Sequence, residues 1–196
     1  MKFSHFLKED RQKPIMGVWY HGDQNKRQNF RDQKMQRDLS TQEGNDEGPG
    51  IYLTRSKKEA NRYAYPNGFV YTVTVHSRKF IWDKYTPSPT EKYETLENLI
   101  DWAPEERQEI GLSNWAEDPQ EAKETALEQY MRWPYHNACV AIYEDFYGES
   151  EANEWANSMV ANDIDGYWKW LDEHEHLVVY NPKIIQIEEE DPYDEV

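Results

Sequence analysis

The order of hydrophobic and polar positions predicts strands in the first part of the chain. An apolar, aromatic stretch at residues 15–20 predicts a first strand, and Ile51–Thr54 predicts a short second one. Phe69–Val75 is β-branched and aromatic and follows the turn-forming residues 66–68, so this segment carries the strongest strand signal of the chain. Residues 79–83 predict a further strand.

From residue 85 to about 160 the pattern becomes helical, with three apolar stripes at spacings of three and four positions. The stripes are Leu96, Leu99, Ile100 and Trp102; Ala122, Ala126, Leu127, Tyr130 and Met131; and Trp155, Met159 and Val160. Strand patterns return at residues 167–170, 177–180 and 184–187. We therefore expect a single α+β domain over residues 1–196, in which early and late strands form one split sheet around an inserted helical block.

The connecting segments predict further local features. A short helix is expected over residues 25–37, and a Gly- and Pro-containing loop over 41–50. Ser56 should cap a helix that runs to about Ala64, with Glu59 completing a capping box. The acidic tail at residues 188–196 is expected to fray.

Composition narrows the class of protein. Only 37% of the residues are hydrophobic, but 8 Trp, 14 Tyr and 6 Phe supply a core, because each aromatic side chain buries a large area. A net charge of −16 argues against non-specific binding to nucleic acids or anionic membranes. An acidic, solvated surface explains this charge most simply; a basic partner, or mimicry of DNA, is the alternative.

The single cysteine excludes an internal disulfide framework. Cys139 lies in an apolar run and is expected to be a small buried hydrophobic residue rather than a nucleophile. No apolar run approaches the roughly 20 residues of a membrane span, and residues 1–7 lack the features of a signal peptide. These observations predict a cytoplasmic protein.

Candidate chemistry is concentrated around two tyrosines. Tyr52 lies on a predicted buried strand and Tyr63 on the helix that follows, so the two rings can form the walls of a slot for a flat cationic ring. Such a cation gains about 0.5–2 kcal/mol against an aromatic face. Upstream, His21 and Gly22 can hold the sugar and the amide attached to that ring. Each residue alone has an ordinary structural explanation, but together they indicate a nicotinamide pocket that uses NAD as a substrate.

The motifs at residues 20–22, 48–52, 56–63 and 175–182, with eleven positions between the two tyrosines, resemble the ADP-ribosyltransferase superfamily. The similarity is to its His-Tyr-acidic branch, which includes diphtheria-type toxins and poly-ADP-ribose polymerases, and small acidic members are familiar among phage proteins. The resemblance implies that His21 binds the ribose hydroxyls of NAD, that the Gly22 backbone binds the amide, and that Tyr52 and Tyr63 sandwich the nicotinamide. It further implies a mono-ADP-ribosyltransferase with a protein acceptor, no metal, and a site of action in the cytoplasm, the host's if the chain is of phage origin.

The third element of the resemblance is offset. The glutamate of the polymerase branch falls on His176, whereas Glu175 lies one residue earlier. Because strand side chains alternate between faces, a bulge would be needed to bring Glu175 into the site, and Asp172 or Glu173 could serve from a loop. Ala60 is a second departure, since many members have a serine there.

The expected catalytic residues are therefore Glu175, His21 and Tyr52, with His176 among the residues that contact NAD. The alternatives are an NAD glycohydrolase and a catalytically inactive protein of the same fold that binds or inhibits a partner. Glu175 in the tyrosine slot would favour an enzyme, and His176 without a nearby carboxylate would favour a binding protein. His174 and His176 flank Glu175, but neighbouring side chains on a strand face opposite ways and no cysteine is nearby, which argues against a zinc site there.

Overall fold

The structure, a computed structural model, describes residues 15, 17–30, 49–77, 79–82, 86–171 and 174–193. It divides into two compact units. The first contains the described residues before 34, residues 51–81 and those from 165 onward, and the second contains mainly residues 82–164. The second unit is thus an insertion in the sequence of the first.

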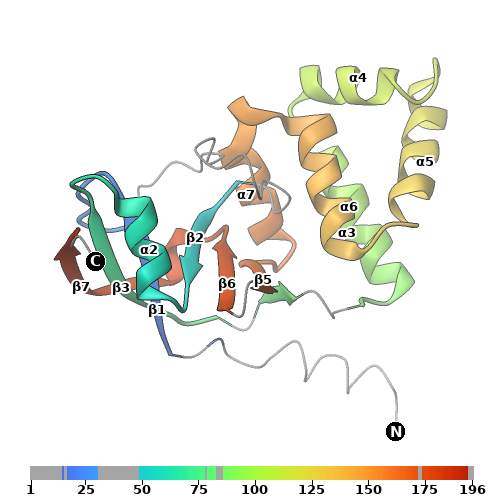
Figure 1. Ribbon diagram of the computed structural model, residues 1–196. Coiled ribbons are helices and arrows are strands. Elements are labelled where there is room, and N and C mark those ends of the chain that lie inside the picture. The colour runs from blue at the N-terminus through green and yellow to red at the C-terminus, as the bar shows by residue number, and fades with distance from the viewer. Residues whose placement is uncertain are drawn as a thin grey trace, which may run out of the picture. The chain divides into compact units, whose positions relative to one another are not determined.

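The first unit is built on a sheet to which early and late parts of the chain both contribute (Figure 1). Within the described residues, the order of its seven strands is β4-β5-β6-β2-β1-β3-β7. Their bounds are β1 Val18–Asp23, β2 Ile51–Thr54, β3 Phe69–Val75, β4 Phe80–Trp82, β5 Gly166–Leu171, β6 His174–Val179 and β7 Ile185–Pro192. The α+β class and the joining of early and late strands are confirmed.

The sheet is weakly joined at its centre. β1 pairs with β3 along its whole length, and β2 pairs with β6 at all four of its residues. Between β1 and β2, however, the ladder contains the single pair Tyr20 and Thr54. The two strands therefore separate beyond this pair, and the backbone groups that they would have exchanged are left to other partners.

Helix α2 (Lys57–Ala64) packs against β1, β2 and β3. Ser56 is its N-cap and accepts a hydrogen bond from the Glu59 N–H, as predicted. The capping box is only half formed, because the Glu59 carboxylate accepts a hydrogen bond from Thr54 instead of bonding the Ser56 backbone. Ala60 and Ala64 form the buried stripe of the helix, which packs on Val70.

The second unit is helical, as the sequence predicts. Its α-helices are α3 Pro89–Asp101, α4 Glu105–Ser113, α5 Pro119–Tyr130, α6 Tyr135–Ile142 and α7 Ala152–Ala161, with a π-helix at Tyr143–Tyr147 and a 3-10 turn at Glu149–Glu151. Prolines lie at the first position or the N-cap of four of these helices, where a missing N–H costs nothing. Leu96, Leu99 and Ile100 are fully buried, and so is Cys139.

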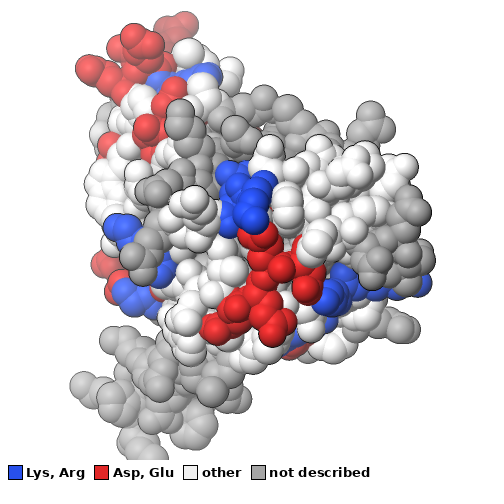
Figure 2. All heavy atoms as spheres, turned by 90° about the vertical axis from the view of Figure 1, so that its left-hand side faces the viewer, with Lys and Arg blue, Asp and Glu red and all other residues white. Residues whose placement is uncertain are grey.

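Two predicted elements differ from the structure where they can be compared. The helix expected at 25–37 is absent from residues 25–30, and residues 31–37 lie outside the described part of the chain. The acidic tail is not frayed through residue 192, because β7 pairs with β3 as the end strand of the sheet. Lysines pair with two of the four acidic residues of β7: Lys26 with Glu190 at 2.8 Å and Lys57 with Asp191 at 2.7 Å. Acidic and basic side chains lie side by side on the face drawn in Figure 2.

Boundaries also differ from those predicted. The first strand begins three residues later than predicted, at Val18, and continues through His21 and Gly22 to Asp23. The 41–50 loop prediction falls almost entirely outside the described residues, as does the signal-peptide prediction for residues 1–7. Among the described residues, no helix has the length and hydropathy that crossing a membrane requires.

Candidate functional site

His21 lies where β1 and β2 separate. Its Nδ1 is 2.8 Å from the backbone carbonyl oxygen of Tyr52. A carbonyl oxygen only accepts, so Nδ1 carries the hydrogen and the ring bonds a backbone group that the interrupted ladder leaves unpaired. The ring is held in place by Phe30, which meets it edge-on at 5.0 Å between centroids. In the neutral ring, Nε2 is therefore a hydrogen-bond acceptor.

The Nε2 atom is buried and has no hydrogen-bond partner among the described residues. The closest charged group is the Asp23 carboxylate, whose Oδ2 lies 3.7 Å away. Burial by itself would raise the pKa of Asp23, but hydrogen bonds from the Asn25 N–H and the Arg27 guanidinium hold this pKa well below its usual range, and a hydrogen on His21 Nε2 would lower it further. Two acceptors, a ring nitrogen and a carboxylate oxygen, are thus set close together.

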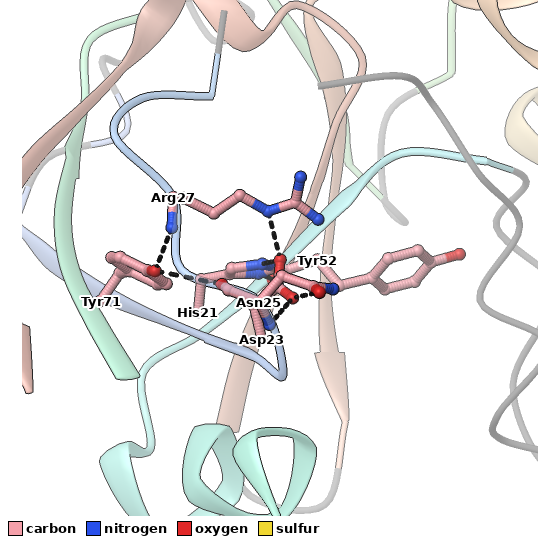
Figure 3. A network of polar contacts seen from close by, with 6 residues as sticks. All are labelled: His21, Asp23, Asn25, Arg27, Tyr52 and Tyr71. Atoms are coloured by element: carbon pink, nitrogen blue, oxygen red, sulfur yellow. Dashed lines mark hydrogen bonds and ion pairs between the residues drawn. The ribbon is translucent and has the colours of Figure 1, made fainter. Parts of the chain in front are cut away.

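The loop after β1 is tied down by the network in Figure 3. Asp23 accepts hydrogen bonds from the Asn25 N–H at 2.7 Å and from Arg27 Nε at 2.6 Å. The Tyr71 hydroxyl accepts from the Arg27 N–H and donates to the Asn25 carbonyl. Burial raises the pKa of Tyr71, so its hydroxyl keeps the proton that it donates.

Gly22 is the point of contact between β1 and α2. A Cβ at this position would lie 1.9 Å from the carbonyl oxygen of Ala60 and 3.0 Å from the backbone nitrogen of Ala64. Only glycine permits this approach. Close packing therefore explains Gly22 without a ligand, and it also sets the Gly22 backbone directly beside the helix that carries Tyr63.

The two tyrosines differ in exposure. Tyr52 is half-buried on β2, and Tyr63, near the end of α2, is 41% exposed. In Figure 3 the ring of Tyr52 points away from His21, although its carbonyl is bonded to the histidine. Alternation along β1 also places the His21 side chain on the face opposite to Tyr20 and Gly22. The structure therefore brings His21 to the backbone of Tyr52 and not to its ring.

The late strand resolves the one-residue offset. β6 pairs with β2 in regular register, with His176 opposite Thr54 and Val178 opposite Tyr52. Paired residues in an antiparallel ladder share a face, so His176 lies on the face of Tyr52 and Glu175 lies on the other. The bulge that would move Glu175 to the Tyr52 face is absent from this ladder, while Asp172 and Glu173 lie outside the described residues.

On its own face, Glu175 has a structural partner. Its Oε2 accepts a hydrogen bond from Arg55 Nε at 2.9 Å. The Arg55 guanidinium also donates to the Val18 carbonyl at 2.6 Å and lies 3.7 Å from the ring centroid of Trp19, which is fully buried. Arg55 thus links Glu175 to β1.

A carboxylate that the sequence prediction assigned only to helix capping lies on the Tyr52 face. Glu59 Oε2 accepts a hydrogen bond from Thr54 Oγ1 at 2.6 Å and is 3.5 Å from His176 Nε2. All three side chains are largely buried, with Thr54 at 5% exposure. The sequence carries no signal for this cluster. It forms because the regular register of β6 with β2 places His176 next to Thr54, which lies five residues before Glu59.

Comparison with known proteins gives no match for this chain. The chain matches no protein-family model, no curated protein and no solved structure. Within the described residues, no group of three or more His, Cys, Asp and Glu side chains could hold a metal ion.

Proposed function

We propose that this chain binds NAD beside β1, β2 and α2 and transfers its ADP-ribose to a macromolecular acceptor, most simply a protein, with release of nicotinamide. The observation that carries the proposal is the state of His21. Its Nδ1–H is committed to the Tyr52 carbonyl, which leaves a buried Nε2 without a hydrogen-bond partner in the described residues. An unpaired buried acceptor of this kind costs stability unless a water molecule or a ligand donates to it, and we assign that donor to NAD.

The chemistry next to His21 suits a ribose. Asp23 Oδ2 and His21 Nε2 are 3.7 Å apart, and two neighbouring hydroxyl groups can donate one hydrogen bond to each. Asp23 stays ionised because its pKa is lowered. Both atoms lie at the gap between β1 and β2, so a ligand held there is next to the backbones of Tyr52 and Gly22.

The nicotinamide is assigned to the α2 side of the same gap. Tyr52 is half-buried and Tyr63 retains a large exposed surface, so both offer aromatic area to a cationic ring.

The test measures NAD binding by calorimetry and nicotinamide release from labelled NAD, with and without a cell lysate as a source of acceptor. We expect Tyr52→Ala and His21→Ala each to abolish NAD consumption while the thermal transition persists. Label on a protein band identifies a transferase, and label found only as free ADP-ribose identifies a glycohydrolase. Wild-type NAD consumption in both variants contradicts the proposal.

Tyr63→Ala gives a graded test with a matched control. Loss of one aromatic wall should weaken NAD binding by about 0.5–2 kcal/mol, which is about 2- to 30-fold in Kd. Tyr93 on α3 has almost the same exposure, 40% against 41%, so Tyr93→Ala removes an equally exposed tyrosine from the helical unit. Equal effects of the two substitutions would show that Tyr63 has no special role in binding.

A second candidate is a non-catalytic binding or inhibitor protein of the same fold. The observation in its favour is the orientation of Glu175, which faces away from Tyr52 and is paired with Arg55. This candidate predicts NAD or nicotinamide binding without any release of nicotinamide, whether or not lysate is present.

A further inference from the structure

A carboxylate stands on the Tyr52 face of the sheet even though β6 contributes a histidine there. We propose that Glu59 is the group that stabilises the positive charge formed on the ribose when NAD is cleaved, and that His176 is its positioning residue. This inference rests on the proposed function and deepens it, because it assigns the acid of the reaction to a helix and not to the late strand.

Three elements hold Glu59 in place. Thr54 on β2 donates a 2.6 Å hydrogen bond to Oε2, and the Thr54 hydroxyl oxygen in turn accepts from the Ser56 N–H at 3.1 Å. His176 on β6 approaches the same Oε2 to 3.5 Å. The Glu59 backbone is fixed by the Ser56 cap. A charge that is fixed in advance stabilises a transition state more than one that must be reoriented.

The second oxygen of the carboxylate is available. Glu59 Oε1 makes no hydrogen bond to any described residue, whereas Oε2 is engaged by two neighbours. The side chain is only 21% exposed, so the field of its charge is screened less than that of a surface carboxylate. Thr54 and His176 therefore orient one oxygen and leave the other to face a ligand.

Glu59 also lies between the two proposed aromatic walls. Tyr52 is two residues before Thr54 on the same face of β2. Tyr63 is four residues after Glu59 on α2, which places the two side chains one above the other on the helix surface. A nicotinamide held by the tyrosines would therefore bring its attached ribose close to this carboxylate, and the ribose assigned to His21 and Asp23 on the other face is then the second ribose of NAD.

The reaction balances without a further reagent. The bond between ribose C1′ and the nicotinamide nitrogen breaks, and its electron pair leaves with neutral nicotinamide. The negative charge of Glu59 stabilises the cationic sugar more than the intact substrate. An acceptor heteroatom then forms the new bond to C1′ and releases its proton to Glu59 or to water.

Capping is the structural alternative for Glu59, and its contribution can be separated from a catalytic one. Ser56 provides the capping hydrogen bond through its own side chain, so Glu59→Gln leaves the cap in place. A glutamine can still accept the Thr54 hydrogen bond and has nearly the same shape. This substitution therefore removes the charge alone.

The experiment compares E59Q, E175Q, the double variant E59Q/H176E and E188Q, using labelled NAD with cell lysate. E188Q is the matched control, because Glu188 also accepts a threonine hydroxyl, from Thr74 at 2.8 Å, at the other side of the sheet. We expect E59Q to lower kcat by about 100-fold, the lower range for a positioned acid or base. KM for NAD, and the thermal transition, should stay near those of the wild type, and E188Q should behave as the wild type.

The double variant tests the position of the charge. E59Q/H176E returns a carboxylate to the same cluster from the other side of a 3.5 Å contact, and should recover at least about tenfold of the lost kcat. Recovered turnover in the double variant would also show that the loss in E59Q comes from the missing charge and not from poor folding. Loss of turnover in E175Q with normal turnover in E59Q overturns the inference.

Different results would overturn the role of Glu59 and the proposed function. Wild-type protein that neither binds nor cleaves NAD overturns the proposed function, and the role of Glu59 with it. Wild-type protein that cleaves NAD, together with E59Q that does so at an unchanged rate, overturns the role of Glu59 alone. Protein that binds NAD without cleaving it supports the binding candidate and removes any catalytic role for Glu59.

Discussion

Substitution of Gly22 by alanine tests the contact between β1 and α2 on which the candidate site depends. The added methyl group would lie 1.9 Å from the Ala60 carbonyl oxygen. Non-bonded carbon and oxygen atoms do not approach closer than about 3.0 Å, so strand and helix must part by at least about 1.1 Å, the difference between the two distances. Both neighbours are backbone atoms, which cannot rotate out of the way.

The energetic cost follows from overpacking. Inserting a methyl group into a well-packed site costs about 1–3 kcal/mol, and the contact in question is among the more severe because it involves backbone on both sides. For a chain of this length, each kcal/mol lowers Tm by about 2–4 °C, so we expect G22A to unfold about 5–10 °C below the wild type. Displacement of α2 would also move Glu59 and Tyr63, so NAD binding should weaken by more than the change in stability alone would cause.

The assay is thermal unfolding followed by circular dichroism, combined with calorimetric titration of NAD at a temperature where both proteins are folded. Val18→Ala is the control in the same strand, because Val18 is 43% exposed and its truncation should change stability by no more than about 0.5 kcal/mol. A Tm for G22A within about 1 °C of the wild type would refute the reasoning, since α2 could not then lie against Gly22 as described.

Two further predictions concern charged residues beside the site. The pKa of Asp23 is lower in the folded than in the unfolded protein, so the ionised carboxylate stabilises the fold fully above about pH 5. This stabilisation is lost as the pH falls through about 4 toward the folded pKa. Asp23→Asn should therefore make the free energy of unfolding depend less on pH in the acid range, and an unchanged dependence would contradict this. Arg55→Ala should lower the free energy of unfolding, measured with denaturant, by about 1–3 kcal/mol, because it removes both the ion pair with Glu175 and the contact with Trp19. Glu175→Gln leaves the contact with Trp19 intact and should lower it by less than about 1 kcal/mol. Equal losses in the two variants would mean that the ion pair dominates.

The sequence predicts elements well where local chemistry and burial agree. β3 combines β-branched and aromatic residues with burial of alternate side chains, and α2 has both an N-cap serine and a two-alanine stripe. The acidic end of the chain was mispredicted because its strand is stabilised by partners far away in sequence. Glu190 and Asp191 are neutralised by Lys26 and Lys57, and no local pattern contains those pairs.

The arrangement of the candidate site also depends on contacts between segments far apart in the sequence. The bond between His21 and the Tyr52 carbonyl depends on where two strands separate, which is a tertiary property that no motif specifies. The identity of the residue on the Tyr52 face of β6 depends on register, and a single residue decides it. Sequence spacing could leave Glu175 and His176 as alternatives but could not choose between them.

The register also changes what a missing glutamate means for activity. If β6 alone supplied the acid, a histidine at position 176 would indicate an inactive protein. The structure instead brings Glu59 within 3.5 Å of that histidine, so a negative charge is present beside the β6 position although it comes from another element. Cleavage requires a negative charge near the ribose in the transition state, whichever residue supplies it. Cleavage of NAD by the wild-type protein therefore decides whether the chain is an enzyme, and the kinetic effects of moving the charge between residues 59 and 176 decide whether Glu59 supplies it.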